Sequence, residues 1–373
     1  MRKMEAAPAL EVVLQQDIRG ELPLILDRHG NRIPCNETEA RIAHLAEGLG
    51  RVPGVRFLAP AAGDAELDAA IHETHDAEYL AFLEQSSASL PEGEMILLDH
   101  PYLPKDIAAD TPIIGGIYHT ARESARTAIT AARLAAQSGG MSYALCRPPG
   151  HHAGRAFLGG HCYINNGVLA LQTVMRSGHG RVGLIDFDIH FGNGSSALIE
   201  GIPNAFFGSV HGATDISYPY IPTYPPNRMQ AFVPFSHPPS PQEFVAAVAG
   251  LVRSALASGC TALVVSAGYD VVADDPHGIW TLDPSVLAEV GMVFAHAGVP
   301  ICIVQEGGYN PERLAACAFH FASGLLCAVE QRAGDRAAHD MHVNRHHPNG
   351  SGLLHEDVHA GRYSPVTDSL NQA

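Results

Sequence analysis

The stretch RVGLIDFDIHFGNGSS, residues 181–196, decides how this chain is organised. Its apolar run, 182–185, gives way to polar residues and then to a turn-forming Gly-Asn-Gly, which is how a buried parallel strand ends. Side chains alternate between the two faces of a strand, so Asp186, Asp188 and His190 point to the same side. Two carboxylates and an imidazole in this pattern form part of a divalent-metal site that still lacks one ligand and a position for water.

A single Asp or His at a strand end usually caps a helix or satisfies a loop. Three such residues on one face are harder to explain in that way, because two buried carboxylates side by side repel each other unless a cation lies between them. The pattern therefore favours a metal or catalytic site. It does not by itself choose the reaction.

Polar clusters follow three further apolar strands. RPPGHHAG, residues 147–154, follows the strand expected at 142–146; SAGYD, residues 266–270, follows 262–265; and QEGGY, residues 305–309, follows 301–304. The adjacent histidines His151 and His152 lie in a loop stiffened by Pro and Gly, where core filling explains them poorly, and they resemble an acid/base pair. Ligands of open α/β sheets bind at the carboxyl ends of the strands, so we expect these clusters to meet in one crevice.

The order of strands, loops and helices predicts a single α/β domain with a mostly parallel central sheet, helices on both faces and right-handed crossovers. Further strands are expected at 11–14, 22–26, 55–58 and 205–210, and a Pro/Tyr-rich connection at 215–235. Helices are expected at 38–49, 67–71, 77–83, 118–136, about 166–176, 241–258, 284–295 and 313–329. In the fifth of these, Asn165 or Asn166 is expected to act as the cap. The catalytic domain is predicted to span residues 1–333, with an acidic loop insertion at about 86–110, and residues 334–373 to form a flexible His-rich tail.

The composition excludes several classes of function. The 373 residues carry 39 acidic and 23 basic side chains, a formal net charge of −16, so nucleic acid and anionic membrane surfaces are not expected as partners. No stretch is long and apolar enough for a membrane span, and residues 1–20 lack the apolar core of a signal peptide. The seven cysteines have no CxxC spacing and lie mostly in apolar runs, which predicts reduced core residues and a cytoplasmic location.

Taken in succession, RPPGHHAG, GGHCYINN, DFDIHFGNG, SAGYD with DDP, and EGGY resemble the zinc-dependent deacetylases of the arginase–deacetylase superfamily. Within that superfamily the chain resembles bacterial acetylpolyamine amidohydrolases and class II histone-deacetylase-like amidohydrolases, and the likeness runs from about His72 to Leu326. The resemblance implies hydrolysis of the linear amide bond of an acetylated amine, of the N-acetylpolyamine or acetyl-lysine type. It also implies one Zn²⁺ per chain held by Asp188, His190 and Asp275.

The resemblance further implies the role of each catalytic side chain. His152 is the general base and later the acid, His151 is its electrostatic partner, and Tyr309 donates its hydroxyl to the oxyanion. Asp186 and Asn193 orient the two histidines. A structural potassium ion near the zinc is implied as well, held by the Asp186 carboxylate and by backbone carbonyls. The carbonyls are those of Asp188, His190, Ser209 and Val210.

The substrate is expected to be a small cationic acylated amine. The resemblance implies that Asp110 holds the substrate at the entrance and that Gly160 and His161 line the channel. Net negative charge and the acidic loop favour a cation through electrostatic steering. By resemblance, this insertion narrows the entrance and supports a homo-oligomer, a dimer or tetramer.

Three departures from the family pattern are visible. Phe191 replaces the second His of the usual HHGNG run, which should alter packing behind the site but leave zinc binding intact. His161 stands where an aromatic residue normally lines the channel and adds a hydrogen-bonding, titratable group. The His-Pro-Glu pattern common near Arg41 is missing, so entry-loop and acetate-exit residues are not transferred.

Two other functions remain open at the level of sequence. One is a ureohydrolase of the same superfamily with two manganese ions, although it would need more Asp and His ligands than the sequence offers. The other is a non-catalytic sensor of acylated amines that keeps the pocket. The intact set of ligands, histidines and tyrosine favours an enzyme over the sensor.

Overall fold

The computed structural model describes residues 9–20, 24–26, 31–91, 94–96, 111–221 and 228–345. It divides into a compact unit, Met1–Gln331, and a second unit, Arg332–Ala373. No helix among the described residues is both long enough and apolar enough to cross a membrane.

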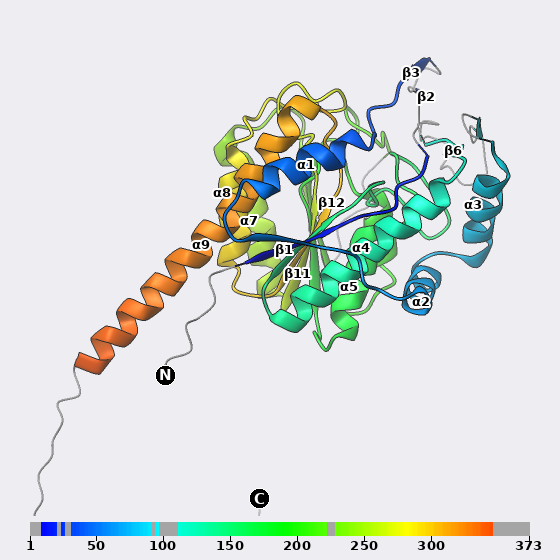
Figure 1. Ribbon diagram of the computed structural model, residues 1–373. Coiled ribbons are helices and arrows are strands. Elements are labelled where there is room, and N and C mark those ends of the chain that lie inside the picture. The colour runs from blue at the N-terminus through cyan, green and yellow to red at the C-terminus, as the bar shows by residue number, and fades with distance from the viewer. Residues whose placement is uncertain are drawn as a thin grey trace, which may run out of the picture. The chain divides into compact units, whose positions relative to one another are not determined.

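An eight-stranded sheet forms the centre of the first unit, with the strand order β10-β9-β8-β11-β12-β7-β1-β4 (Figure 1). Every neighbouring pair in it is parallel. The predicted α/β architecture with a parallel central sheet is confirmed. In chain order the strands are β1 (Leu10–Leu14), β4 (Val55–Leu58), β7 (Met141–Leu145), β8 (Val182–Asp186), β9 (Ala205–Gly212), β10 (Gln230–Phe235), β11 (Ala262–Ala267) and β12 (Ile301–Gln305).

Helices cover both faces of the sheet, because the strands are apolar on both sides. Within β8, Leu184 packs into the core with α4 (Ile117–Ser138) and α5 (Asn166–Arg176), while the next residue, Ile185, packs into the opposite core. That opposite core also contains residues of α1 (Ala40–Gly50), α7 (Pro241–Ala257), α8 (Val286–His296) and α9 (Pro311–Arg345). Alternate residues of one strand thus face different helix layers.

The remaining elements are short. Helices α2 (Asp64–Thr74) and α3 (Ala77–Ser89) pack with part of α4 around a third apolar cluster, and α6 (Asn193–Ile199) follows β8. Two small antiparallel pairs lie outside the main sheet: β2 (Leu24–Leu26) with β3 (Arg32–Pro34), and β5 (Met95–Ile96) with β6 (Ile113–Ile114).

Local signals set several helix ends, and the expected Asn165 cap is among them. The Asn165 side chain accepts a hydrogen bond from the Val168 amide and caps α5, and Ser240 with Glu243 forms a capping box at the start of α7. Gly139 ends α4 in the left-handed conformation, with φ of 68°.

Two expectations differ from the structure. The Pro/Tyr-rich connection at 215–235 contains the edge strand β10, whose Pro234 is tolerated because an edge strand has a free side. Helix α9 continues to Arg345, past the expected end at residue 329, since the Ala- and Arg-rich sequence there contains no proline to stop it. Most of the acidic loop, at 92–93 and 97–110, and residues 346–373 of the tail lie outside the described residues.

The strands that carry the polar clusters, β8, β11, β12 and β7, are consecutive in the sheet. Since they are parallel, their carboxyl ends share one edge, and the four clusters meet there. The crevice expected from the sequence is therefore built by the middle of the sheet.

Candidate active site

Three ligand atoms converge beyond the ends of β8 and β11. The Nδ1 atom of His190 lies 3.0 Å from Asp188 Oδ1 and 3.2 Å from Asp270 Oδ2. Asp188 and Asp270 are fully buried, and His190 is nearly so. Asp270 Oδ2 has no hydrogen-bond partner in the described part of the chain. Two carboxylates and one imidazole nitrogen arranged in this way could hold a metal ion.

Two glycines give these carboxylates their space. A Cβ added to Gly268 would lie 2.1 Å from Asp188 Oδ2, and one added to Gly307 would lie 2.2 Å from Asp270 Oδ2. The backbone of Gly307 instead donates a hydrogen bond to Asp188 Oδ2, at 2.8 Å. Burial and the neighbouring Asp188 charge raise the pKa of Asp270 to about 7. A divalent cation would relieve the repulsion between the Asp188 and Asp270 carboxylates. Two carboxylates and one imidazole, with the space that the two glycines leave, therefore fit zinc.

The paired histidines lie beside this group, each oriented by a different residue. His151 Nδ1 is 3.0 Å from Asp186 Oδ2, and His152 Nδ1 is 2.7 Å from Asn193 Oδ1. The two rings are 4.0 Å apart, and both side chains are buried. Because Nδ1 of each ring is taken by its partner, Nε2 is the atom that can exchange a proton with a substrate or water.

The same contacts drive the two histidines toward opposite charge states. Burial lowers the pKa of His151, but the Asp188 and Asp186 carboxylates outweigh it and raise this pKa to about 10. Burial and the neighbouring His151 charge hold the pKa of His152 well below its usual value. Two titratable groups whose pKa values are pushed apart are typical of an acid/base pair.

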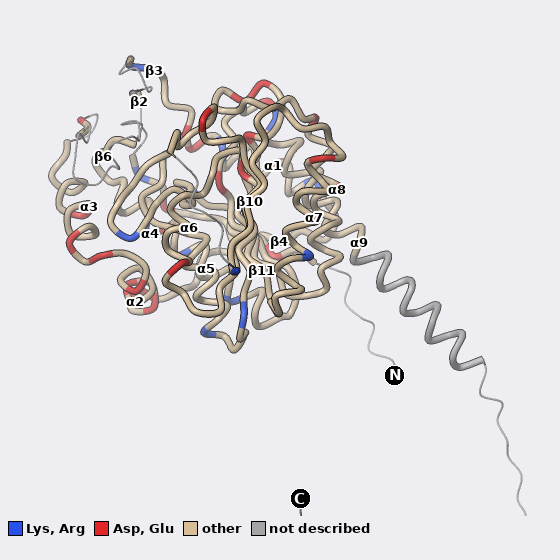
Figure 2. The backbone as a smooth tube through the Cα atoms, turned by 180° about the vertical axis from the view of Figure 1, so that it is seen from behind, with Lys and Arg blue, Asp and Glu red and all other residues tan. Residues whose placement is uncertain are grey.

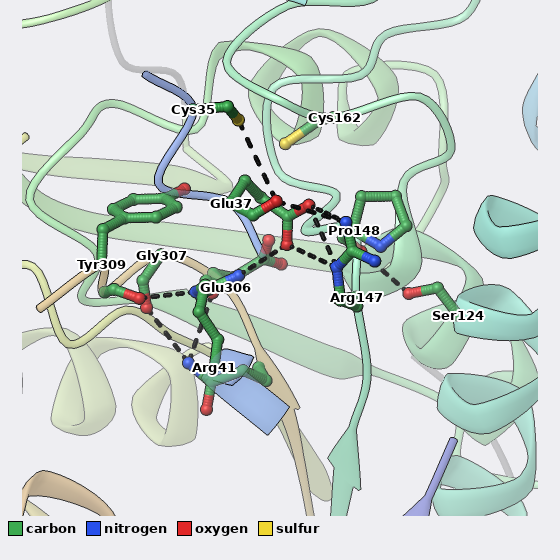
Figure 3. A network of polar contacts seen from close by, with 12 residues as sticks. Cys35, Glu37, Arg41, Ser124, Arg147, Pro148, Cys162, Glu306, Gly307 and Tyr309 are labelled. Carbon is green, nitrogen blue, oxygen red and sulfur yellow. Dashed lines mark hydrogen bonds and ion pairs between the residues drawn. The ribbon is translucent and has the colours of Figure 1, made fainter. Parts of the chain in front are cut away.

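Tyr309 lies after β12, held through its backbone and its ring. Its amide donates a hydrogen bond to Asp275 Oδ2, at 2.6 Å. The Arg41 guanidinium carbon lies 4.6 Å from the centre of the tyrosine ring, and Figure 3 shows Arg41 and Tyr309 as neighbours. The tyrosine is therefore fixed in one position at the strand ends that carry the ligand group.

Comparison with known proteins agrees with this geometry. The family model described as the histone deacetylase domain matches residues 35–325, which is most of the chain. The chain belongs to the histone deacetylase family. It is an amidohydrolase of the deacetylase type, as expected from its motifs.

Several of the similar proteins are named acetylpolyamine amidohydrolases. The protein of that name from Mycoplana ramosa is 32% identical over 264 residues, covering 64% of this chain and 77% of its own. Acetylpolyamine amidohydrolase 1 of Pseudomonas aeruginosa is 30% identical, covering 67% of this chain and 80% of its own. The crystal structure of acetylpolyamine aminohydrolase from Burkholderia pseudomallei aligns with a TM-score of 0.74 at 28% identity, covering 86% of this chain and 99% of that one.

This group of three contains Asp270, whereas the resemblance implies Asp275 as the third ligand, and that assignment stays a prediction. Asp270 joins Asp188 and His190, whereas Asp275 lies outside the group. Its oxygens are taken by backbone amides, since Oδ2 accepts from Tyr309 and Asn310 and Oδ1 accepts from His277. Through these bonds Asp275 anchors the loop that carries Tyr309.

The structure describes most of the other residues expected at the site. Gly160 and His161 lie beside His152 and Tyr309, respectively, and Asp110 lies outside the described residues. Of the positions expected at a potassium ion, Ser209 pairs with Asp186 across β9 and β8. Phe191 is fully buried and packs its ring on His211 and Phe232, away from the ligand group, in keeping with its expected role in packing.

Sequence reasoning missed a buried ion network next to Tyr309. Glu37 accepts from Arg41, at 3.0 Å, and from both Nε and Nη2 of Arg147, at 3.0 and 2.6 Å (Figure 3). Arg41 also donates to the Glu306 and Gly308 carbonyls of the tyrosine loop, at 2.6 Å each. The spacing of Glu37 and Arg41, one helical turn apart, was the available signal.

The cysteines agree with the composition. None of the seven forms a disulfide; Cys327 is exposed and the other six are buried. His75 is buried, and its ring bridges the Gly154 carbonyl and the Asn165 amide.

Proposed function

We propose that this deacetylase is a zinc enzyme that removes acetyl or similar acyl groups from small acylated amines, with N-acetylpolyamines as the substrate class. The observation that carries the proposal is the convergence of Asp188, His190 and Asp270 beside a histidine pair. In this proposal those three residues hold one zinc ion, with Asp275 as the alternative third ligand. When bound, zinc polarises the amide carbonyl of the substrate and acidifies water.

The histidine pair handles the proton. Asn193 Oδ1 accepts the Nδ1 proton of His152, which leaves Nε2 as the acceptor for the proton of the attacking water. The same atom returns that proton to the leaving amine nitrogen when the amide bond breaks. His151, bonded to Asp186, supplies positive charge next to the developing oxyanion.

Tyr309 completes the site. Its hydroxyl donates a hydrogen bond to the oxyanion that develops on the amide oxygen. Arg41 acts on this step indirectly, because it binds two carbonyls of the tyrosine loop and lies over the ring. We therefore treat Arg41 as a positioning residue.

Several features support a small cationic substrate. Four relatives are named acetylpolyamine amidohydrolases, and the chain has a net charge of −16. Helices α2 and α3 contain Asp and Glu but no Lys or Arg (Figure 2), and the α2 acids pair with arginines of α4 and α5, as Asp64 does with Arg126. A net negative charge raises the local concentration of cations and so favours N-acetylpolyamines over acetylated proteins. Asp110 is proposed to hold the cation at the entrance.

We further propose a structural potassium ion and a homo-oligomeric, cytoplasmic enzyme. The pairing of Asp186 with Ser209 supports the ion site, and the free cysteines support a reducing compartment. Light scattering of the purified protein tests the assembly. The residues proposed at the ion are Asp186, Asp188, His190, Ser209 and Val210.

The decisive experiment measures acetate release and metal content together. N-Acetylputrescine and an acetyl-lysine coumarin reporter are offered to protein purified from chelated medium and reloaded with Zn²⁺ or Mn²⁺. We expect turnover with one zinc per chain and a higher kcat/KM for N-acetylputrescine. Two manganese ions per chain would indicate a ureohydrolase instead, and a loaded protein that releases no acetate from any acylated amine would indicate a sensor.

A further inference from the structure

A tight turn carries His161 in an unusual backbone conformation. Gly159 and Cys162 pair across it, with the Cys162 amide 2.8 Å from the Gly159 carbonyl. The two central residues both have positive φ, 52° at Gly160 and 65° at His161, which is the type I′ hairpin turn. Gly160 is required because a Cβ there would lie 2.1 Å from His152 Cδ2. A non-glycine residue held in this region is strained, and such strain gathers at ligand sites.

The turn places the His161 ring against two others. Its centre lies 5.5 Å from that of Tyr309 and 5.5 Å from that of His277, and His277 lies 4.7 Å from Tyr309. His277 comes from the loop after β11, where Asp275 holds its amide. Two imidazoles from distant parts of the chain thus form one wall beside the proposed oxyanion tyrosine.

One nitrogen of this wall has no partner. His161 is 5% exposed, and its Nδ1 atom has no hydrogen-bond partner in the described part of the chain. Leaving such a buried atom unpaired is unfavourable, because it has lost its bonds to water. His277, in contrast, has its Nε2 atom 3.4 Å from the side-chain Nδ2 atom of Asn36, and this contact orients the ring.

The His161 ring is neutral at neutral pH. Burial lowers the pKa of His161 to about 4, and the nearby Arg41 guanidinium acts in the same direction. A neutral imidazole carries one nitrogen that accepts a hydrogen bond. A hydrophobic residue at either position would offer none.

We propose that His161 and His277 form a hydrogen-bonding site that accepts an N–H or O–H group on the chain of the acylated amine. The inference rests on the proposed deacetylase function and adds a requirement for a donor on the substrate. His161 supplies the unpaired acceptor, and His277 braces its ring and extends the polar wall. Acylated amines with a plain alkyl chain leave the His161 nitrogen buried and unpaired, and are therefore poorer substrates.

The test compares three substrates of equal length. N-Acetylputrescine is measured beside analogues with the same four-methylene chain, in which the terminal amine is replaced by a hydroxyl or by a methyl group. The wild type is expected to prefer both donor-bearing chains. His161→Gly, which removes the ring and relaxes the turn, and His277→Leu, at an ordinary backbone position, should each lower the hydroxyl-over-methyl ratio of kcat/KM about 3–10-fold. The amine-over-methyl ratio should fall further, about tenfold or more.

His296→Leu, an exposed histidine on α8, is the matched control and should leave both ratios unchanged. Unchanged ratios in both site variants would overturn the proposal while leaving the deacetylase assignment intact. A fall in the amine ratio alone would also overturn it, because the site would then read charge rather than a donor. Absence of acetate release from every substrate would instead refute the proposed function.

Discussion

The two aspartates that follow β11 allow the ligand assignment to be tested directly, by changing each to asparagine. Asp270→Asn removes the carboxylate charge that opposes the cation and weakens one of three proposed ligands. We expect stoichiometric zinc to be lost on gel filtration and turnover to fall with it, since loss of even a supporting residue behind a metal ligand costs 10–100-fold in affinity.

Asp275→Asn should behave differently, because its two oxygens hold three backbone amides. Asparagine has one oxygen, so at least one of these amides faces an NH₂ group and loses its partner. That costs about 1–3 kcal/mol, and a small shift of Tyr309 can lower kcat by up to about 10²-fold. We expect zinc to stay bound, with kcat about 10–100-fold lower.

Metal content by mass spectrometry and acetate release from the coumarin reporter are measured on the same preparations. Circular dichroism checks that each variant is folded. If Asp275→Asn loses zinc while Asp270→Asn keeps it at near-normal turnover, the assignment made from the structure is wrong and the one made from the sequence is right.

Three further outcomes are expected. Tyr309→Phe should keep zinc and fold but lower kcat about 10²–10³-fold, as for other oxyanion donors; a change confined to KM would assign the tyrosine to binding. Glu37→Gln should lower the free energy of unfolding in urea by about 3–5 kcal/mol, because it breaks a buried ion network. The control Glu47→Gln, in an exposed pair with Arg51, should change it by less than about 1 kcal/mol. Equal effects of the two substitutions would contradict this reasoning. Burial raises the pKa of Glu37, but Arg147 and Arg41 outweigh burial and lower this pKa from 4.5 to about 2. The stability that the Glu37 carboxylate contributes is therefore fully present above pH 4.5 and lost as the pH falls toward 2. If the difference in unfolding free energy between wild type and Glu37→Gln does not narrow over that range, the proposed ion network does not stabilise the fold in this way. Finally, kcat/KM for N-acetylputrescine should fall with added salt while that for a neutral reporter holds, and a salt-independent preference for the neutral reporter would argue against steering.

The sequence by itself determined the parallel sheet and much of the site. Apolar runs that end in polar clusters are local features, so they can be read along the chain without knowing what lies next to them. His151, His152, Asp186, Asp188 and Tyr309 could be found in this way, because each comes directly after a strand and parallel strands bring such positions to one edge.

Only the tertiary structure separated Asp270 from Asp275. Both follow β11 within a few residues, and the direction of the backbone after Asp270 decides which carboxylate faces His190. The same limit applies to Arg41, whose bonds to Glu306 and Gly308 join positions 265 and 267 residues apart. No local pattern encodes a contact over such a distance.

The wall of His161 and His277 is a further case of this limit. The sequence marked His161 as unusual but gave no reason to consider His277, which is 116 residues further along the chain than His161. The β7–α5 turn and the loop after β11 bring the two rings together at Tyr309. Periodicity therefore fixes which strand end a residue occupies, whereas the packing of loops from different strands decides which side chains meet there.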